Sequence, residues 1–208
     1  MNLSIISWII YDIGNTLFNA GITGLFFPLW VITKLNGTDA TVGYTLAIGL
    51  LATLIISPII GAVSDQAKTR KVFLGISTIL CGLSTTLIGN STIIVSLLSF
   101  GFAVATLHIG DIFYNSMLKD VSSKKNIGFI GGIGAGIGYL GAIMAILIGL
   151  FIIEDQGYPL GFIIMGILII IFGIPILFYL KEKPNKKQNR YIKISTNIMI
   201  KSEMKKLN

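Results

Sequence analysis

Three ionisable side chains lie well inside long apolar runs of this sequence: Asp12 in the first run, and His108 and Asp111 in the fourth. Such groups are costly in the hydrocarbon of a bilayer, so each indicates a pathway for protons, ions or solutes. The chain has one histidine, and no Ser-His-Asp set or cluster of metal ligands accompanies it. The sequence therefore predicts transport chemistry and no enzyme, metal site or cofactor.

Amide side chains extend these groups into two polar stripes. Residues at i, i+3 and i+7 share one face of a helix. That spacing joins Asp12, Asn15 and Asn19, and again His108, Asp111 and Asn115. Lipid would penalise both stripes, so we expect them to line the bundle interior or a water-filled cavity. For the three asparagines, a hydrogen bond to a neighbouring helix is an equally good explanation.

Six apolar runs are long enough to place these stripes within a membrane. A spanning helix takes about 20 mostly apolar residues, and the expected spans are 8–31, 42–63, 72–90, 92–116, 128–152 and 159–180. Only 12% of the residues are charged, against roughly 25% in a soluble chain. We expect an all-α integral membrane protein in which residues 1–183 form six transmembrane helices. Trp8 and Trp30 are expected to anchor the first span at the two interfaces.

The basic residues give this bundle an orientation. Fifteen of the 16 Lys and Arg lie within 68–71, 119–125 and 181–206. By the positive-inside rule these segments are cytoplasmic, as are both termini, and the loop at Glu154 faces outward. The net charge of +7 belongs to membrane-flanking loops, so no nucleic-acid partner is expected. Residues 184–208 are expected to form a basic cytoplasmic tail or the start of a central loop.

The orientation also sets the depth of the two carboxylates. Asp12 lies four residues after Trp8, or about 6 Å into the first span. Asp111 lies eight residues before Lys119, or about 12 Å into the fourth. Both therefore belong to the cytoplasmic half of the membrane. If they face each other, each favours protonation of the other, and His108 would relay a proton or pair with Asp111.

The fifth span is rich in glycine, at Gly132, Gly134, Gly136, Gly138 and Gly141. Small residues four apart allow membrane helices to approach closely. Residues 136–141 also fit the pattern Gly-x-Gly-x-x-Gly, but no strand precedes them, so a dinucleotide-binding loop is excluded. We expect a packing helix with a sliding surface.

The connection after the second span resembles the signature loop of the major facilitator superfamily. Residues 61–71 read Gly-Ala-Val-Ser-Asp-Gln-Ala-Lys-Thr-Arg-Lys, similar to Gly-x3-Asp followed by Gly-Arg-Lys/Arg. Lys68 and Thr69 replace the usual second Gly and first Arg. The resemblance implies a conformational latch made of Gly61, Asp65, Arg70 and Lys71. In that latch Gly61 lets helices approach, and the two basic residues bind other helix ends.

Two further regions resemble the vacuole-effluxer-like branch of that superfamily, whose vacuolar members are linked to autophagy and amino-acid efflux. Residues 8–16 are similar to Trp-x-x-Tyr-Asp-x-x-Asn-Ser. Residues 113–118 and 138–141 are similar to Phe-Tyr-Asn-Ala-Leu-Leu and Gly-Tyr-x-Gly. The resemblance implies alternating access, with the first and fourth helices lining a central cavity. Asp111 stands outside the branch pattern.

The resemblance covers residues 1 to about 183 and implies the N-terminal six-helix half of a two-half transporter. The expected function is secondary transport of a small polar solute, an amino acid being one candidate, with protons as a candidate coupling ion. The expected location is the plasma membrane of a microbe. The second half would be a separate chain, a second copy of this one, or lost. The alternatives are an inactive remnant and an assembly subunit that moves nothing.

Overall fold

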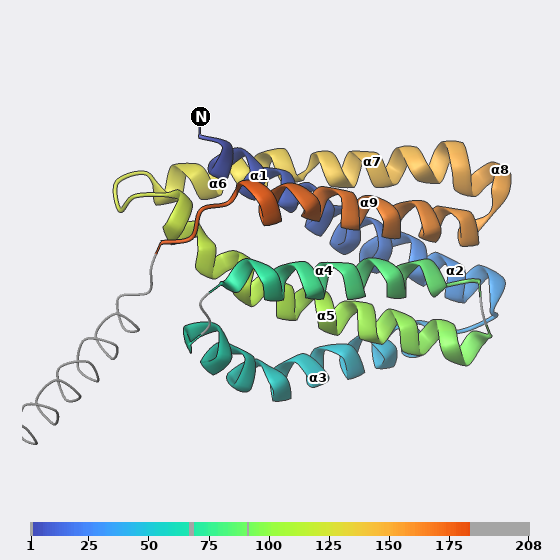
Figure 1. Cartoon of the computed structure of the whole chain (residues 1–208). Coiled ribbons are helices and arrows are strands. Elements are labelled where there is room, and N and C mark those ends of the chain that lie inside the picture. Colours follow the sequence, from blue (N-terminus) through green and yellow to red (C-terminus); the bar gives the residue numbers. More distant parts are fainter. Residues whose placement is uncertain (1, 67–68, 91, 184–208) are drawn as a thin grey trace, which may run out of the picture.

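The computed structural model describes residues 2–66, 69–90 and 92–183, apart from the side chains of residues 63–66. Within these residues the chain is helical, and six long helical stretches lie side by side (Figure 1). The N-terminus, the start of the fifth stretch and the end of the sixth lie at the same end of the bundle. The expected all-α membrane fold is confirmed.

The six stretches are built from eleven elements in the described part of the chain. The first comprises α1 (Leu3–Thr16), the π-helix η1 (Leu17–Phe26) and α2 (Phe27–Lys34); the next three are α3 (Asp39–Gln66), α4 (Arg70–Leu87) and α5 (Ile93–Val121). The fifth comprises α6 (Ile127–Gly138), α7 (Leu140–Ile148), the π-helix η2 (Gly149–Ile153) and α8 (Glu154–Gln156), and the sixth is α9 (Tyr158–Tyr179). The first two stretches extend three to five residues beyond the expected spans at each end, whereas α4 ends three residues before the end of its expected span and α9 agrees to within one residue.

Five of the stretches are long and apolar enough to cross a membrane: Leu3–Lys34, Asp39–Ala62, Ile93–Val121, Ile127–Gln156 and Tyr158–Tyr179. The third expected span, α4, is not among them, because its 18 residues include Arg70, Lys71 and five Ser or Thr. Several of these hydroxyls donate to carbonyls of their own helix, as Thr85 Oγ1 does to Cys81 at 2.8 Å. Helix α4 also lies between α5 and α9, and four of its five hydroxyl side chains are buried there, those of Ser77, Thr78, Ser84 and Thr85.

Neighbouring helices follow the order α3, α5, α4, α9, α1 and then α6–α7. Helix α3 lies at one edge, where only 11% of its apolar window is buried. Helix α1 packs against α9 and α6 and also touches α5. The two helices that carry the polar stripes are therefore in contact.

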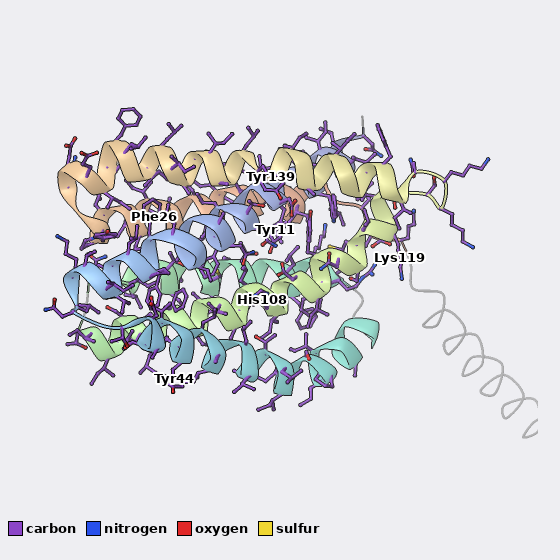
Figure 2. All side chains as sticks on the ribbon, turned by 180° about the vertical axis from the view of Figure 1, so that it is seen from behind. Tyr11, Phe26, Tyr44, His108, Lys119 and Tyr139 are labelled. Carbon is purple, nitrogen blue, oxygen red and sulfur yellow. The ribbon has the colours of Figure 1, made fainter. Side chains whose placement is uncertain are left out.

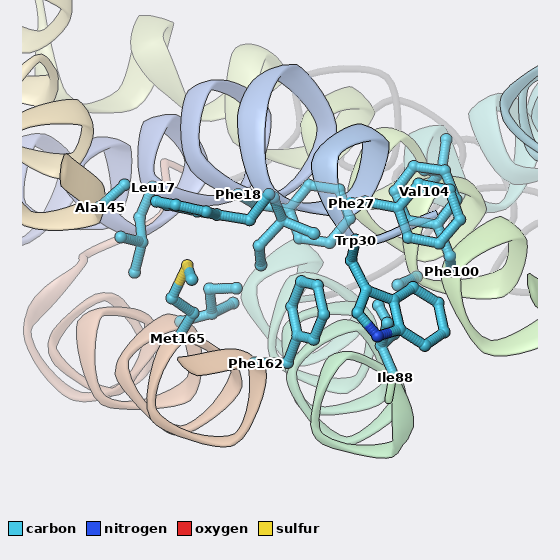
Figure 3. Packing of buried hydrophobic residues seen from close by; sticks show 14 of the residues in the cluster. Leu17, Phe18, Phe27, Trp30, Ile88, Phe100, Val104, Ala145, Phe162 and Met165 are labelled. Atoms are coloured by element: carbon cyan, nitrogen blue, oxygen red, sulfur yellow. The ribbon is translucent and has the colours of Figure 1, made fainter. Parts of the chain in front are cut away.

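Two apolar clusters hold the bundle together, one toward each end. The Phe27 cluster includes Phe27, Trp30, Phe100 and Phe162 (Figure 3), and the rings of Phe27 and Phe100 stack with centroids 3.5 Å apart. The Trp8 cluster includes Trp8, Tyr11, Phe113, Tyr114 and Ile176.

The tryptophan anchors were predicted wrongly. Trp8 and Trp30 are only 3% and 6% exposed, so neither presents its ring to a lipid interface. Trp8 stacks on Tyr114 with ring centroids 4.5 Å apart, and its Nε1 donates to the Tyr114 carbonyl at 3.2 Å. Because an indole N–H is satisfied equally well by a buried carbonyl, spacing alone does not separate an anchor from a core residue.

Candidate functional site

The two polar stripes meet where α1 packs against α5. Asn15 Nδ2 donates to Asp111 Oδ1 at 2.5 Å, and Asn19 Nδ2 donates to Asn15 Oδ1 at 2.6 Å. On the other side of the carboxylate, His108 Nδ1 lies 3.2 Å from Asp111 Oδ2. These four residues form one hydrogen-bonded chain, called here the polar relay. Figure 2 places His108 about midway along α5.

Within the described part of the chain each oxygen of Asp111 has one hydrogen-bond partner, so the carboxylate is held in a fixed orientation between the two helices. The relay is nevertheless open along one side. The side chains of His108 and Asp111 are 33% and 22% exposed, and Asn19 is exposed. A proton or a polar solute reaching that side would therefore meet the relay directly.

Asp12 stands outside the relay. Among the described residues no hydrogen bond joins the two carboxylates, although they interact electrostatically. The side chain of Asp12 turns instead toward α6, where a methyl group on Gly138 would lie 2.6 Å from its Oδ2. Among the described residues Asp111 is thus hydrogen-bonded to Asn15 rather than to Asp12.

Tyr114 is a neighbour of Asp12 to which sequence reasoning gave no role. Its ring lies between Trp8 and Tyr11, with centroid distances of 4.5 and 4.8 Å. Its hydroxyl interacts with the Asp12 carboxylate, although full hydrogen-bond geometry to any described residue is not reached. The available signal was the helical spacing, because Tyr114 lies three residues after Asp111 and Trp8 three before Tyr11.

The remaining member of the second stripe, Asn115, is exposed and takes no part in the relay. No group of three or more His, Cys, Asp or Glu suited to a metal ion occurs among the described residues.

The glycines of the fifth span divide between two faces. A Cβ on Gly134 would meet the Trp8 ring at 2.5 Å, one on Gly138 would meet Asp12, and one on Gly141 would meet the Ile13 carbonyl. Gly132 and Gly136 have no described neighbour within 4 Å of such a Cβ. The expectation that all five glycines pack against other helices therefore does not hold for Gly132 and Gly136 within this bundle. Each helical residue adds about 100°, so positions two residues from Gly134 lie on the opposite face of the helix.

The basic end of α4 is tied to α5. Arg70 pairs through Nη2 with Asp120 Oδ2 at 2.5 Å, and its Nη1 lies 3.4 Å from the Ser116 carbonyl. A Cβ added at Gly61 would meet no described neighbour within 4 Å, and the Asp65 side chain lies outside the described part of the chain. Of the four latch residues, Arg70 and Lys71 are thus placed at helix ends, and Gly61 shows no close approach.

Residues 180–183, called here the strap, follow α9 and cross the ends of other helices. Glu182 accepts hydrogen bonds from the backbone N–H groups of Arg70 at 3.0 Å and Lys71 at 2.5 Å. Lys183 Nζ donates to the carbonyls of Lys119 at 2.8 Å and Ser122 at 2.9 Å. A carboxylate thus caps the N-terminus of α4 and an ammonium the C-terminus of α5, the signs that helix dipoles favour. Sequence reasoning missed both contacts because they join distant segments.

Comparison with known families decides what kind of protein carries this site. The sequence model described as Major Facilitator Superfamily matches residues 14–205. The chain belongs to the major facilitator superfamily. This is a family of membrane transporters, so a multi-pass membrane protein and a non-enzymatic role follow from membership.

Two curated proteins are similar in sequence to this chain. An uncharacterized protein of Aquifex aeolicus (strain VF5) is 26% identical over 179 residues, which cover 85% of this chain and 45% of that protein. The uncharacterized MFS-type transporter YxiO of Bacillus subtilis (strain 168) is 24% identical over 211 residues, which cover 86% of this chain and 48% of that protein. The chain therefore spans about half the length of these relatives. No solved structure gives a significant match.

Proposed function

We propose that the chain forms one six-helix half of a secondary transporter for a small polar solute. The observation that carries the proposal is the polar relay, which joins an ionisable pair, His108 and Asp111, to amides of the first span. Polar side chains within membrane spans persist where they serve a pathway, because lipid penalises them. The candidate pathway residues are Asp12, Asn15, Asn19, His108, Asp111 and Asn115.

Proton coupling is the role proposed for the carboxylates and the histidine. Protonation of Asp111 would remove its charge and turn one of its oxygens into a donor, which weakens the bond from Asn15. His108, on the other oxygen, would accept or supply the proton. Binding of a proton would thus change the contact between the first and fourth spans, which is the kind of change that alternating access needs.

The exposed side of the polar relay supports the proposal that a second protein unit covers it. In a bilayer these polar groups must face water or protein, and the half-length match to relatives supports a second six-helix unit in this role. That unit would be further residues of the same protein, a separate chain or a second copy. The proposed location is the plasma membrane of a microbe, and the resemblance to the vacuole-effluxer-like branch makes an amino acid the leading solute. The proposed conformational latch of this transporter consists of Gly61, Asp65, Arg70 and Lys71.

Flux measurements in proteoliposomes test the proposal. The chain is reconstituted alone and together with a second six-helix unit, and uptake of labelled amino acids is followed with and without an imposed proton gradient. We expect gradient-driven uptake that falls by roughly tenfold or more in Asp111→Asn, because proton transfer through that carboxyl is lost. Asp155→Asn, an equivalent change on the exposed end of α8, serves as the matched control.

The outcome separates the alternatives. No flux of any tested solute with any second unit would favour a non-transporting assembly subunit or an inactive remnant. Equal flux in Asp111→Asn and Asp155→Asn would remove the relay from the pathway.

A further inference from the structure

The fifth span passes Asp12 at the junction of α6 and α7. Helix α6 ends at Gly138 and α7 begins at Leu140. A methyl group on Gly138 would lie 2.6 Å from Asp12 Oδ2 and 3.1 Å from both Asp12 Cγ and Thr16 Oγ1. A Cβ essentially cannot lie within 3.0 Å of such an atom, so the carboxylate lies in the space that the missing side chain leaves.

The neighbouring glycines show that this fit is specific to one position. Gly134 faces the Trp8 ring, and Gly141 faces the backbone of Ile13. Both are packing contacts with uncharged groups. Among the glycines of α6 and α7, Gly138 is therefore the one whose missing side chain makes room for an ionisable group.

Three elements surround the Asp12 carboxylate. Helix α1 carries it, Gly138 of α6 lies against one side, and α5 presents Tyr114 and Asp111. Asp12 also interacts with Tyr11 of its own helix, and the titratable groups that act on it from α5 are Tyr114 and Asp111. A shift of the carboxylate away from α6 would therefore change its distance to both.

We propose that Gly138 is a positioning residue for Asp12: its missing side chain holds the carboxylate beside Tyr114 and away from the polar relay. This deepens the proposed transport function and rests on it. The fifth span then acts on the protonation of Asp12 without contributing a charged group. Movement of α6 along α1 would carry Gly138 past the carboxylate and alter the proton affinity of Asp12.

The pH titration of Asp12 tests this directly. The carboxyl C=O infrared band is followed with pH in the purified chain and is assigned to Asp12 by its loss in Asp12→Asn. Gly138→Ala is compared with Gly134→Ala, which disturbs Trp8 instead, and with Gly136→Ala, which has no described neighbour. We expect the Asp12 midpoint to move by about one pH unit in Gly138→Ala only. An unmoved midpoint, or an equal shift in Gly134→Ala, would overturn the proposal.

A double-substitution cycle keeps the test valid if Gly138→Ala folds poorly. Gly138→Ala should lower the midpoint of thermal unfolding, and this decrease should disappear when Asp12→Ala removes the clashing carboxylate. The decrease caused by Gly134→Ala should remain in the Asp12→Ala background. A Gly138→Ala loss unchanged by Asp12→Ala would contradict the proposal. Both measurements use the purified chain without flux, so absence of transport would remove the proposed function and leave this test standing.

Discussion

At the scale of single residues, the contact between Asn15 and Asp111 decides the character of the site. The amide gives the carboxylate a hydrogen bond without adding a charge. A carboxylate at position 15 would put two like charges within hydrogen-bond distance, as in paired carboxylates that share one proton.

Asn15→Asp should therefore make stability depend on pH. The folded protein would bind a proton between the two carboxyls more tightly than the unfolded protein does, so stability is retained at low pH and lost as pH rises. At neutral pH we expect a loss of about 1–3 kcal/mol, read from thermal unfolding in detergent across pH. Asn115→Asp, at an exposed position of the second stripe, should change little. Similar pH curves for the two variants would contradict the geometry.

At the scale of elements, the strap joins helix ends through backbone groups. Thr69, at the N-cap of α4, makes no side-chain capping bond, and Glu182 supplies the acceptor from 112 residues away along the chain. Because its partners are amides and carbonyls, the polarity of the strap is set by helix direction. The contacts of the strap therefore depend on the relative positions of the ends of α4 and α5.

Glu182→Ala should destabilise the protein by about 1 kcal/mol, the typical value of a helix cap. Exchange of the Arg70 and Lys71 amide hydrogens with deuterium should become faster. Glu154→Ala, at an exposed acidic residue of α8, is the control. The double variant Glu182→Lys/Lys183→Glu, which exchanges the two charges, should not regain the stability of the unchanged protein. If it did, side-chain ion pairs and not backbone caps would hold the strap.

The crossing of α4 and α9 depends on two glycines. A Cβ on Gly166 would lie 2.5 Å from the Gly82 carbonyl oxygen, and one on Gly82 would lie 2.6 Å from that of Gly166. Gly166→Ala should force the helices apart and cost about 1–3 kcal/mol of stability, measured by unfolding in detergent. Gly61→Ala, which meets no described neighbour, should be neutral, and a loss of equal size there would contradict this packing.

At the scale of the whole molecule, the open side of the relay predicts where a partner unit lies. Asn19→Cys and Asn115→Cys should react with a water-soluble maleimide when the chain is alone, because both positions are exposed. Native Cys81, which is 0% exposed, is the internal control for reagent reaching the core. Reaction at both positions should be suppressed when a second six-helix unit is present. Unchanged labelling would place the partner elsewhere.

The sequence predicted the helical class, since apolar length and basic loops depend on the bilayer alone. It also predicted that the stripes avoid lipid, and the structure brings Asn15 to Asp111. It could not predict that Asp12 turns to Gly138, because that depends on how α6 is rotated against α1. Contacts such as Arg70 with Asp120 and Glu182 with α4 join segments far apart in the sequence. Such contacts leave no pattern in the local residue spacing from which they could be predicted.

The arrangement of the two apolar clusters has a mechanical consequence. The Phe27 cluster and the Trp8 cluster are each tightly interlocked, and the hydrogen-bonded groups of α1 and α5 lie between them. Interlocked cores resist small deformations, whereas hydrogen bonds can be exchanged for others or for water. The bundle therefore consists of two packed apolar blocks joined by exchangeable hydrogen bonds, and the first span changes from α-helix to π-helix at Leu17, a residue of the Phe27 cluster. Bending at these hydrogen bonds would tilt one block against the other without unpacking either apolar cluster.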